Sequence, residues 1–243
     1  MCTLAAAASS GEIQMKPYRV AVALTAATLV SLSMQGPASA AATTTLALWN
    51  MNEAPHSTVL VDSSGHGING VIGSEVVLNG SVHTFPYLKP NTPPAHPGHP
   101  DQVNNALLNP GTRDYAITLR MKWTNSFGNI IQKGQSGTVG GYFKLQAPNG
   151  IVQCLFRGST GNAGVGSVRA LNDGQWHVIT CTRTATALTM VVDGVQVSTL
   201  KHATGNISNT KPLSIAGKLA CDQIKVTCDY WVGQMDYVQI STS

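Results

Sequence analysis

The chain has 243 residues, only 11% of them charged, and its 15 Lys and Arg exceed its 11 Asp and Glu to give a formal net charge of +4. The basic residues are scattered singly, which excludes the clustered Lys/Arg footprint of a nucleic-acid-binding domain. Once the leader described next is set aside, about 200 residues remain, enough for one domain with a sizeable core.

The first 40 residues are typical of a secretory leader. A basic segment at 15–19 precedes an apolar run at 20–32, and Ala38-Ser39-Ala40 supplies the small residues that signal peptidase reads. The apolar run is shorter than the roughly 20 residues that a membrane span needs. We expect a natural start at Met15, cleavage after Ala40, no membrane span, and a secreted product with a single domain at residues 41–243.

Short strands separated by turns account for the pattern after the leader. The clearest is 115–123, where apolar and polar residues alternate so that one face is apolar. No stretch of about ten residues has a helical period with caps, so an antiparallel sandwich or barrel of about ten to fourteen strands is expected, most naturally a jelly roll. Other strands are expected at 46–51, 59–61, 71–72, 76–78, 129–132, 142–146, 151–157, 213–215 and 230–240.

The loop at 62–70 is dense in turn formers and in oxygen ligands. Asp62, Ser64 and Asn69 belong to it, and Asp236 lies near the start of the last strand. First and last strands are often neighbours in such sandwiches, so these residues are candidates for a structural Ca²⁺ site. The alternative is an Asx turn at Asp62 with Asp236 as an edge charge, since turn formers and calcium ligands are the same residue types.

Residues 83–105 form a segment rich in Pro and His. Its six prolines exclude a regular helix or a central strand. His96 and His99 suggest a metal site, but the Pro-Gly pair between them gives no fixed ligand geometry. We expect an ordered surface loop with exposed histidines.

The strongest local signal is a hairpin over residues 172–199. A β-rich run at 176–183 is followed by an apolar run at 188–192, the dipeptide Asp193-Gly194, and an alternating run at 195–199. Asp-Gly between two such runs predicts a type I′ turn. We expect Trp176 in the core and His177 on the opposite face. A concave sheet could hold a ligand there, which makes His177 a candidate contact, but a histidine that is satisfied by the protein or half-exposed is favoured because nothing pairs with it in sequence.

Four cysteines follow the leader, Cys154, Cys181, Cys221 and Cys228. An even number in an exported chain predicts two disulfides, for which three pairings are possible. Cys221 and Cys228 flank a short segment and can pair across a tight loop, which leaves Cys154 with Cys181. Zinc ligation is disfavoured because no C-x₂-C spacing occurs.

Three short motifs resemble the laminin G-like group of the concanavalin A-like lectin/glucanase superfamily. They are Trp176-His177 after Asp173-Gly174, the Val192-Asp193-Gly194 turn, and Gly233-x-x-Asp236. Residues 109–118, 128–137, 141–158 and 212–236 more closely resemble secreted bacterial LamG-like jelly-roll proteins. The resemblance implies a sandwich of two curved antiparallel sheets. It implies no reaction, because the superfamily holds lectins, adhesion modules and hydrolases alike.

The catalytic motifs of related folds are incomplete in this chain. Retaining glycosidases need two carboxyl groups about 5–5.5 Å apart, but Glu53 and Glu75 are the only Glu after the leader and neither has a carboxylate two residues away. Tyr142-Phe143-Lys144 is similar to a strand of alginate lyases, yet the arginine-rich motif that accompanies it there is absent. No G-x-S-x-G elbow occurs either.

We therefore expect an all-β jelly-roll sandwich that acts as a secreted, non-catalytic binding module. Its partner would be a carbohydrate or a cell-surface or other extracellular protein, with no nucleic acid and no membrane span. His177, Tyr142 and Trp231 are the candidate ligand-binding residues, the two aromatics because such rings stack on sugars. A glycan hydrolase or lyase with a non-standard active site is the alternative.

Overall fold

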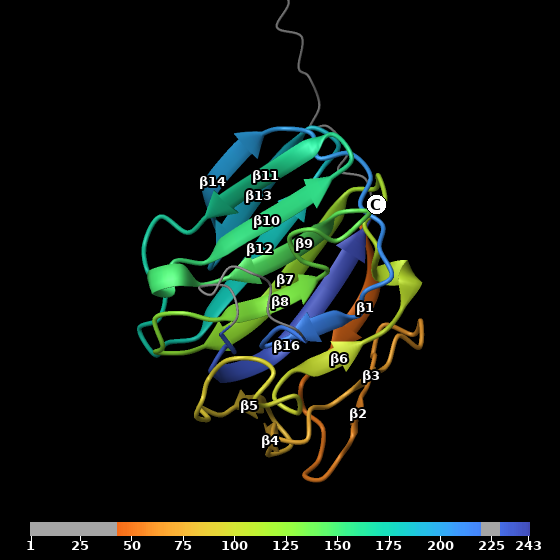
Figure 1. Ribbon diagram of the computed structural model, residues 1–243. Coiled ribbons are helices and arrows are strands. Elements are labelled where there is room, and N and C mark those ends of the chain that lie inside the picture. Colours follow the sequence, from red (N-terminus) through yellow and green to blue (C-terminus); the bar gives the residue numbers. More distant parts are fainter. Residues whose placement is uncertain (1–42, 220–228) are drawn as a thin grey trace, which may run out of the picture. The chain divides into compact units, whose positions relative to one another are not determined.

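Residues 43–219 and 229–243 are described by a computed structural model, and they form two antiparallel sheets (Figure 1). Sheet A has the strand order β14-β13-β12-β7-β16-β5-β4, with β1 also paired to β16. Sheet B has the order β11-β10-β9-β8-β15-β6-β3-β2. The expected all-β jelly-roll sandwich is confirmed.

Most strands are short, as the turn-rich sequence predicts. Sheet A contains β1 (Thr44–Trp49), β4 (Val77–Leu78), β5 (His83–Phe85), β7 (Tyr115–Lys122), β12 (His177–Arg183), β13 (Ala187–Val192), β14 (Val195–Lys201) and β16 (Gly233–Thr242). Sheet B contains β2 (Val59–Leu60), β3 (Gly70–Val71), β6 (Asp101–Val103), β8 (Asn129–Lys133), β9 (Tyr142–Gln146), β10 (Gln153–Gly158), β11 (Gly161–Gly166) and β15 (Leu213–Ile215). The described helical turns are η1 (Ala106–Leu108) and η2 (Pro148–Gly150).

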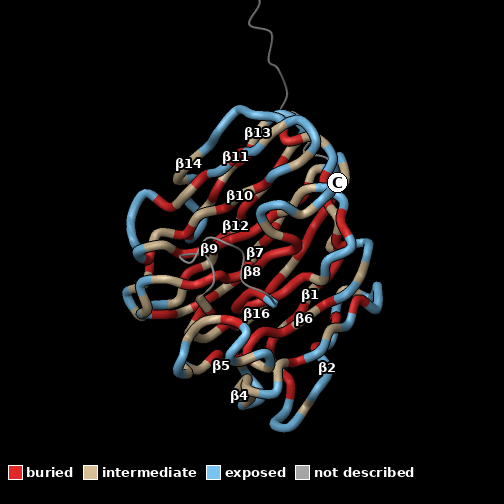
Figure 2. The backbone as a smooth tube through the Cα atoms, in the orientation of Figure 1, coloured by how far each residue is buried: buried red, intermediate tan, exposed pale blue. Residues whose placement is uncertain are grey.

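The core lies between the sheets, and buried residues are concentrated along the central strands (Figure 2). In β7 every second residue from Tyr115 to Met121 is buried, while the residues between them are half-buried. Cys154 of β10 and Cys181 of β12 form a disulfide with their Cα atoms 6.3 Å apart. This is the pair that the sequence favoured, and it joins sheet B to sheet A. Cys221 and Cys228 lie outside the described residues.

The predicted hairpin is confirmed. Val192 pairs with Val195 across the turn, and Asp193 and Gly194 have φ values of 51° and 81°, as a type I′ turn requires. The first and last described strands are neighbours, since Trp49 of β1 pairs with Val238 of β16. No helix within the described part of the chain has the length and apolar character of a membrane span.

The predicted orientation of the strand after Gly174 is wrong. His177, Ile179, Cys181 and Arg183 face the core, and Trp176 is half-buried on the other side. The polar groups of the inward-facing His177 and Arg183 form hydrogen bonds with other parts of the protein. Both ring nitrogens of His177 meet carboxylates, and the Arg183 guanidinium donates to main-chain carbonyls at Gly111 and Gly205.

Three strands are not anticipated by the sequence pattern, namely β5, β6 and β11. β5 and β6 border the Pro/His-rich segment and have only three residues each, too few for a period to show. The prolines fall between these two strands. β11 is the glycine-rich sequence GNAGVG, which pairs with β10 along its whole length. Its glycines suit a close approach to β10, since a Cβ on Gly164 would lie 2.7 Å from the Leu155 side chain.

Candidate functional site

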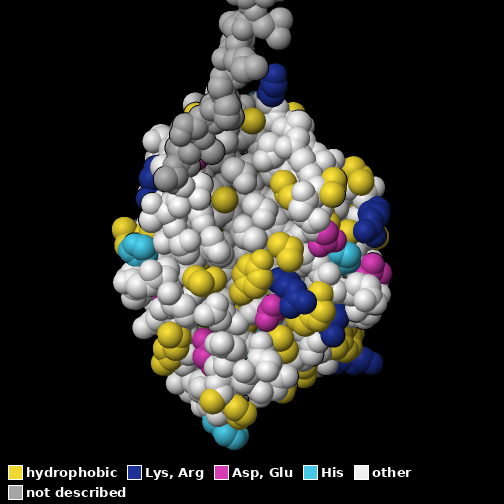
Figure 3. All heavy atoms as spheres, turned by 180° about the vertical axis from the view of Figure 1, so that it is seen from behind, with side chains coloured by type: hydrophobic (Ala, Val, Ile, Leu, Met, Phe, Trp, Pro, Cys, Tyr) yellow, Lys and Arg dark blue, Asp and Glu magenta, His cyan; other side chains and the backbone are white. Residues whose placement is uncertain are grey.

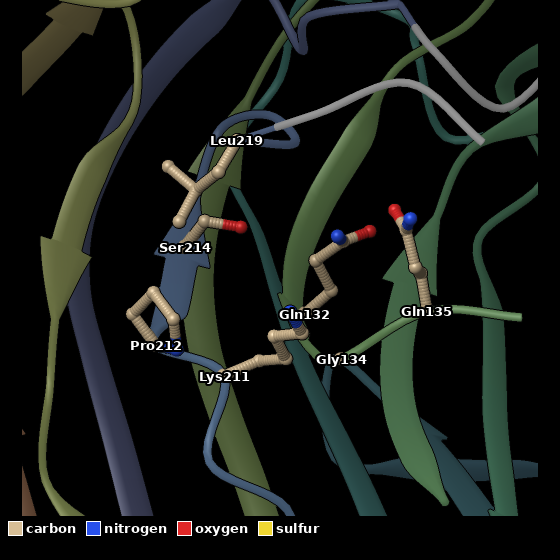
Figure 4. Close-up of a pocket in the computed structure, with 7 residues that line it drawn as sticks. All are labelled: Gln132, Gly134, Gln135, Lys211, Pro212, Ser214 and Leu219. Carbon is tan, nitrogen blue, oxygen red and sulfur yellow. The ribbon is translucent and has the colours of Figure 1, made fainter. Parts of the chain in front are cut away.

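A pocket of about 240 Å³ opens on the outer side of sheet B, the side turned away from sheet A (Figure 4). β8 and β15 run side by side at its floor, where Gln132 pairs with Ser214. Because side chains alternate along a strand, these two polar residues point away from the core, which receives Ile131, Leu213 and Ile215. The lining consists of Gln132, Gly134, Gln135, Lys211, Pro212, Ser214 and Leu219.

The side-chain amide of Gln132 indicates what kind of ligand this pocket could bind. Its side chain is buried to 5% exposure, yet its Oε1 has no hydrogen-bond partner among the described residues. The Ser214 hydroxyl is already used, because it donates to the Gly217 carbonyl over 2.7 Å. In Figure 4 the amide groups of Gln132 and Gln135 lie on the same side of the pocket and turn toward each other. A buried acceptor without a donor is unusual, and it suits a ligand that brings hydroxyl or amine hydrogens.

The loop between β8 and β9 separates this pocket from a second hollow. That hollow measures about 360 Å³, and its polar lining includes Thr138, Arg157, Ser159 and Asn206. The loop depends on glycine, because a Cβ on Gly141, whose φ is 85°, would lie 2.1 Å from the Arg157 carbonyl oxygen. Val139 on this loop is 93% exposed, so the loop presents an apolar side chain to solvent beside two polar hollows.

Tyr142, predicted as a ligand contact, lies between the two hollows. It is the first residue of β9 and is half-buried. A Cβ on Gly134, in the lining of the first pocket, would lie 3.1 Å from the Tyr142 Cβ. Across the strands Tyr142 pairs with Arg157, which lines the second hollow. Tyr142 itself belongs to the lining of neither hollow, although it lies next to lining residues of both.

His177 and Trp231, the other two predicted ligand contacts, are not available to a ligand. The ring nitrogens of His177 lie 2.7 Å from an Asp193 carboxylate oxygen and 3.1 Å from one of Asp173, and the residue is 4% exposed. Trp231 is completely buried, packs against Phe85 and Trp123, and gives its carbonyl to His99. Neither ring has a free face for a sugar. A strand pattern cannot reveal such partners, because they come from other elements.

The sequence also contains a Gln-x-His tripeptide, Gln175-Trp176-His177. Alginate lyases carry such an element together with the Tyr-Phe-Lys strand. In this protein Tyr142 lies on the outer side of sheet B, whereas His177 faces the core from sheet A. The two elements therefore do not meet around one space.

The candidate calcium ligands have other partners. The Asp62 carboxylate accepts hydrogen bonds from the main-chain N–H groups of Leu48, Ser64 and Ile68 and from the Ser64 hydroxyl, at 2.9–3.0 Å. Partial burial alone would raise the pKa of Asp62, but these donors lower it overall. The Asn69 side-chain oxygen accepts from the Asp62 N–H over 2.8 Å. This is the pattern of an Asx turn that holds β1 against the following loop.

Asp236 lies in a different environment. Its carboxylate pairs with Arg120 over 2.6 Å. Within residues 43–219 and 229–243, no three His, Cys, Asp or Glu side chains are grouped so that they could hold a metal ion.

A buried ionic cluster was not predicted by any sequence signal. His83 of β5 lies 2.8 Å from Glu53 through one ring nitrogen and 2.8 Å from Asp101 of β6 through the other. Burial alone would lower the pKa of His83, but the hydrogen bonds to the two carboxylates raise it to about 9. Burial raises the pKa of Asp101, so the cluster binds a proton firmly at neutral pH. His83 and Asp101 are completely buried, and the cluster joins sheet A to sheet B.

The histidines of the Pro/His-rich segment are not exposed as predicted. His99 is completely buried, and its ring packs 4.6 Å from that of Tyr230. His96 is half-buried and pairs with Glu75 over 2.8 Å. The segment therefore packs against the chain before β16 instead of standing free on the surface.

Comparison with known structures shows where this fold recurs. Domain 4 of AbnA, a GH43 extracellular arabinanase from Geobacillus stearothermophilus solved in complex with arabinotriose, has a TM-score of 0.57 and 14% identity, covering 83% of this chain and 93% of that one. The binding domain of botulinum neurotoxin serotype D has a TM-score of 0.57 and 12% identity, covering 82% and 47%. Domains LG4-5 of the mouse laminin alpha1 chain have a TM-score of 0.47 and 18% identity, covering 54% and 37%.

At identities this low, the two structures with a TM-score of 0.57 show a shared fold and nothing further. The chain spans less than half the length of the laminin and neurotoxin structures. No curated protein matches it. The family model Laminin_G_3, described as concanavalin A-like lectin/glucanases superfamily, matches residues 99–243, more than half of the chain. By that match, and by its two antiparallel sheets, the chain belongs to the Laminin_G_3 family of the concanavalin A-like lectin/glucanases superfamily.

Proposed function

We propose that the protein is a secreted, non-catalytic module that binds a glycan in the pocket between β8 and β15. The observation that carries this proposal is the buried, unpartnered Oε1 of Gln132 in the lining of that pocket. A sugar hydroxyl would supply the missing donor at a site that is already held in shape by the strands beneath it.

The remaining lining fits the same class of ligand. The Gln135 amide and the Lys211 ammonium group offer hydrogen bonds to hydroxyl oxygens, while Pro212 and Leu219 offer apolar surface to the C–H face of a sugar ring. The similar domain of the arabinanase was solved with arabinotriose, which supports an oligosaccharide as the ligand class.

One set of acid–base groups supports binding without catalysis. Glu53 and Asp101, the carboxylates that His83 brings together, are enclosed in the core, so that a substrate has no path to them. The leader pattern, with its basic start, apolar run and Ala-x-Ala end, supports secretion.

A glycan array probed with residues 41–243, with arabinotriose among the neutral oligosaccharides, tests the proposal. We expect binding to at least one neutral glycan and a loss of about tenfold in affinity for Gln135→Ala, which removes one hydrogen-bonding amide at the rim. Gln196→Ala, an exposed glutamine of β14 in the other sheet, is the matched control and should bind as the unaltered protein does. Release of shorter sugars from the array would favour a hydrolase or lyase, and equal effects of both variants would contradict the site.

A further inference from the structure

The outer side of sheet A, turned away from sheet B, carries an aromatic and basic cluster. Trp176 precedes β12 and is half-buried. The Arg120 guanidinium carbon lies 4.5 Å and the Lys122 ammonium nitrogen 5.0 Å from the centre of the Trp176 ring. Both cations belong to β7 and alternate with the core residues Leu119 and Met121. This is where Trp176 lies instead of in the core.

The cluster continues into a hollow. Lys122 pairs across the strands with Gln234 of β16, and both line a pocket of about 260 Å³ with Trp123, Thr124, Asn125, Gly174, Val232 and Gly233. Trp123 is 3% exposed, and its ring packs against those of His177 and Trp231, so it belongs to the core and only borders the hollow. A hollow that adjoins a lysine and an arginine suits a ligand with negatively charged or carbonyl oxygens.

The charges on this side favour an anion. Arg120 is paired with Asp236, while Lys122 is not part of any ion pair in residues 43–219 and 229–243. The view from behind in Figure 3 shows hydrophobic, basic and acidic side chains gathered near the middle of this side, amid mostly uncharged surface. Asp173 and Asp193 lie beyond the cluster and are directed to His177.

We infer that this cluster is a second binding site, for an acidic glycan whose carboxylates meet Lys122 and Arg120 while a sugar ring packs beside Trp176. A protein partner is less well suited, because protein interfaces have an apolar centre, and none of the large exposed hydrophobic residues belongs to β7, β12 or β16. The inference does not depend on the proposal for the pocket on sheet B, which lies on the opposite side and would take a neutral sugar.

Calorimetric titration of residues 41–243 with a galacturonic acid trimer and with a galactose trimer tests the inference. We expect the acidic trimer alone to bind through this cluster, and its affinity to fall about tenfold in both Lys122→Gln and Trp176→Ala, since a charge contact or a stacking contact is lost. Lys201→Gln removes an exposed lysine of β14 and changes the net charge equally, so it should leave the affinity unchanged. Binding should also change the tryptophan fluorescence, and Trp176→Phe should remove that change.

Each other outcome overturns the site. No binding of the acidic trimer, equal weakening by Lys201→Gln, or full affinity in Trp176→Ala would do so. Poly-L-glutamate that bound with the same sensitivity to the variants, in place of the acidic trimer, would assign the cluster to a protein partner. Thermal melting of each variant shows that it is folded. Gln135→Ala should bind the acidic trimer normally, which separates a failure here from a failure of the pocket on sheet B.

Discussion

Single residues in this protein illustrate how a polar group can be buried in a β-sandwich. His83 is placed between two carboxylates, Arg183 between main-chain carbonyls, and His177 between Asp173 and Asp193. The partners of His83 lie 18 and 30 residues away along the chain, whereas one partner of His177, Asp173, lies only four residues before it. Burial of a charge without such partners would be strongly unfavourable, so these residues hold particular loops and strands in register.

The His83 cluster predicts a pH dependence of stability. The pKa of the His83 imidazole is raised to about 9 from an ordinary value near 6.5, so the folded protein binds this proton more tightly than the unfolded chain does. The stabilisation is therefore complete below about pH 6.5 and is lost as the pH rises through about 9. Urea unfolding should show a free energy of unfolding that falls between these pH values.

Replacement of His83 tests whether this residue causes the pH dependence of stability. His83→Gln should lower the free energy of unfolding by about 3 kcal/mol at pH 6.5, because two carboxylates lose their buried partner. In the same variant, the free energy of unfolding should fall much less between pH 6.5 and pH 9. His202→Gln, at an exposed position, is the control and should retain both the stability and the decline. A decline of equal size in the His83 variant would contradict the role of this residue.

At the scale of elements, the disulfide between β10 and β12 is the covalent link between the sheets. It closes a loop with a sequence separation of 27 residues. Replacement of Cys154 and Cys181 together by Ala should reduce the free energy of unfolding by about 3–4 kcal/mol, mainly because the unfolded chain gains freedom. Chemical denaturation of the double variant measures this. A single replacement is a poorer test, since it leaves a free thiol in the core.

Local patterns predicted the elements well where the side chains themselves encode them. The Asp193-Gly194 turn and the alternation along β7 appear as expected, because positive φ and a half-buried face leave direct marks on the sequence. The sequence did not predict β5, β6 and β11, since a strand of three residues is too short to show a hydrophobic period and a glycine-rich strand has few side chains to show one. Their pairing is decided by the neighbouring strands.

The candidate sites were less accessible to sequence reasoning. Tyr142 is a candidate because aromatic rings stack on sugars, and it is half-buried at the start of β9. Gln132 gave no signal, since its importance lies in an oxygen that the fold leaves without a donor. Trp176 and Trp231 were assigned to the wrong environments because a tryptophan at the end of a strand suits either side of a sheet, and packing from other elements decides which.

For the molecule as a whole, the two proposed sites lie on opposite sides of one sandwich. Gln132 and Gln135 line a pocket on the outer side of sheet B, and Trp176 and Lys122 belong to the outer side of sheet A. The rigid core between them, with its disulfide, should prevent one ligand from distorting the other site. Each glycan should therefore bind with the same affinity whether or not the second is present.

Simultaneous binding predicts that the protein bridges two kinds of glycan. A polymer of galacturonic acid immobilised on a sensor should capture the protein, which should then retain a neutral glycan selected from the array. Trp176→Ala should weaken the capture about tenfold, and Gln135→Ala should weaken only the second step. Competition between the two glycans, measured as release of the protein by soluble neutral sugar, would mean that they share a site.

The pairing of β1 with β16 has a mechanical consequence. Thr44 and Thr242 are cross-strand partners, so the two ends of the described sandwich leave it side by side (Figure 1). A pulling force applied through these ends would break the hydrogen bonds between β1 and β16 one after another, because it would not load them all at once in shear. β1 should therefore detach at low force, while the segment closed by Cys154 and Cys181 would bear no load until β16 had also left the sheet.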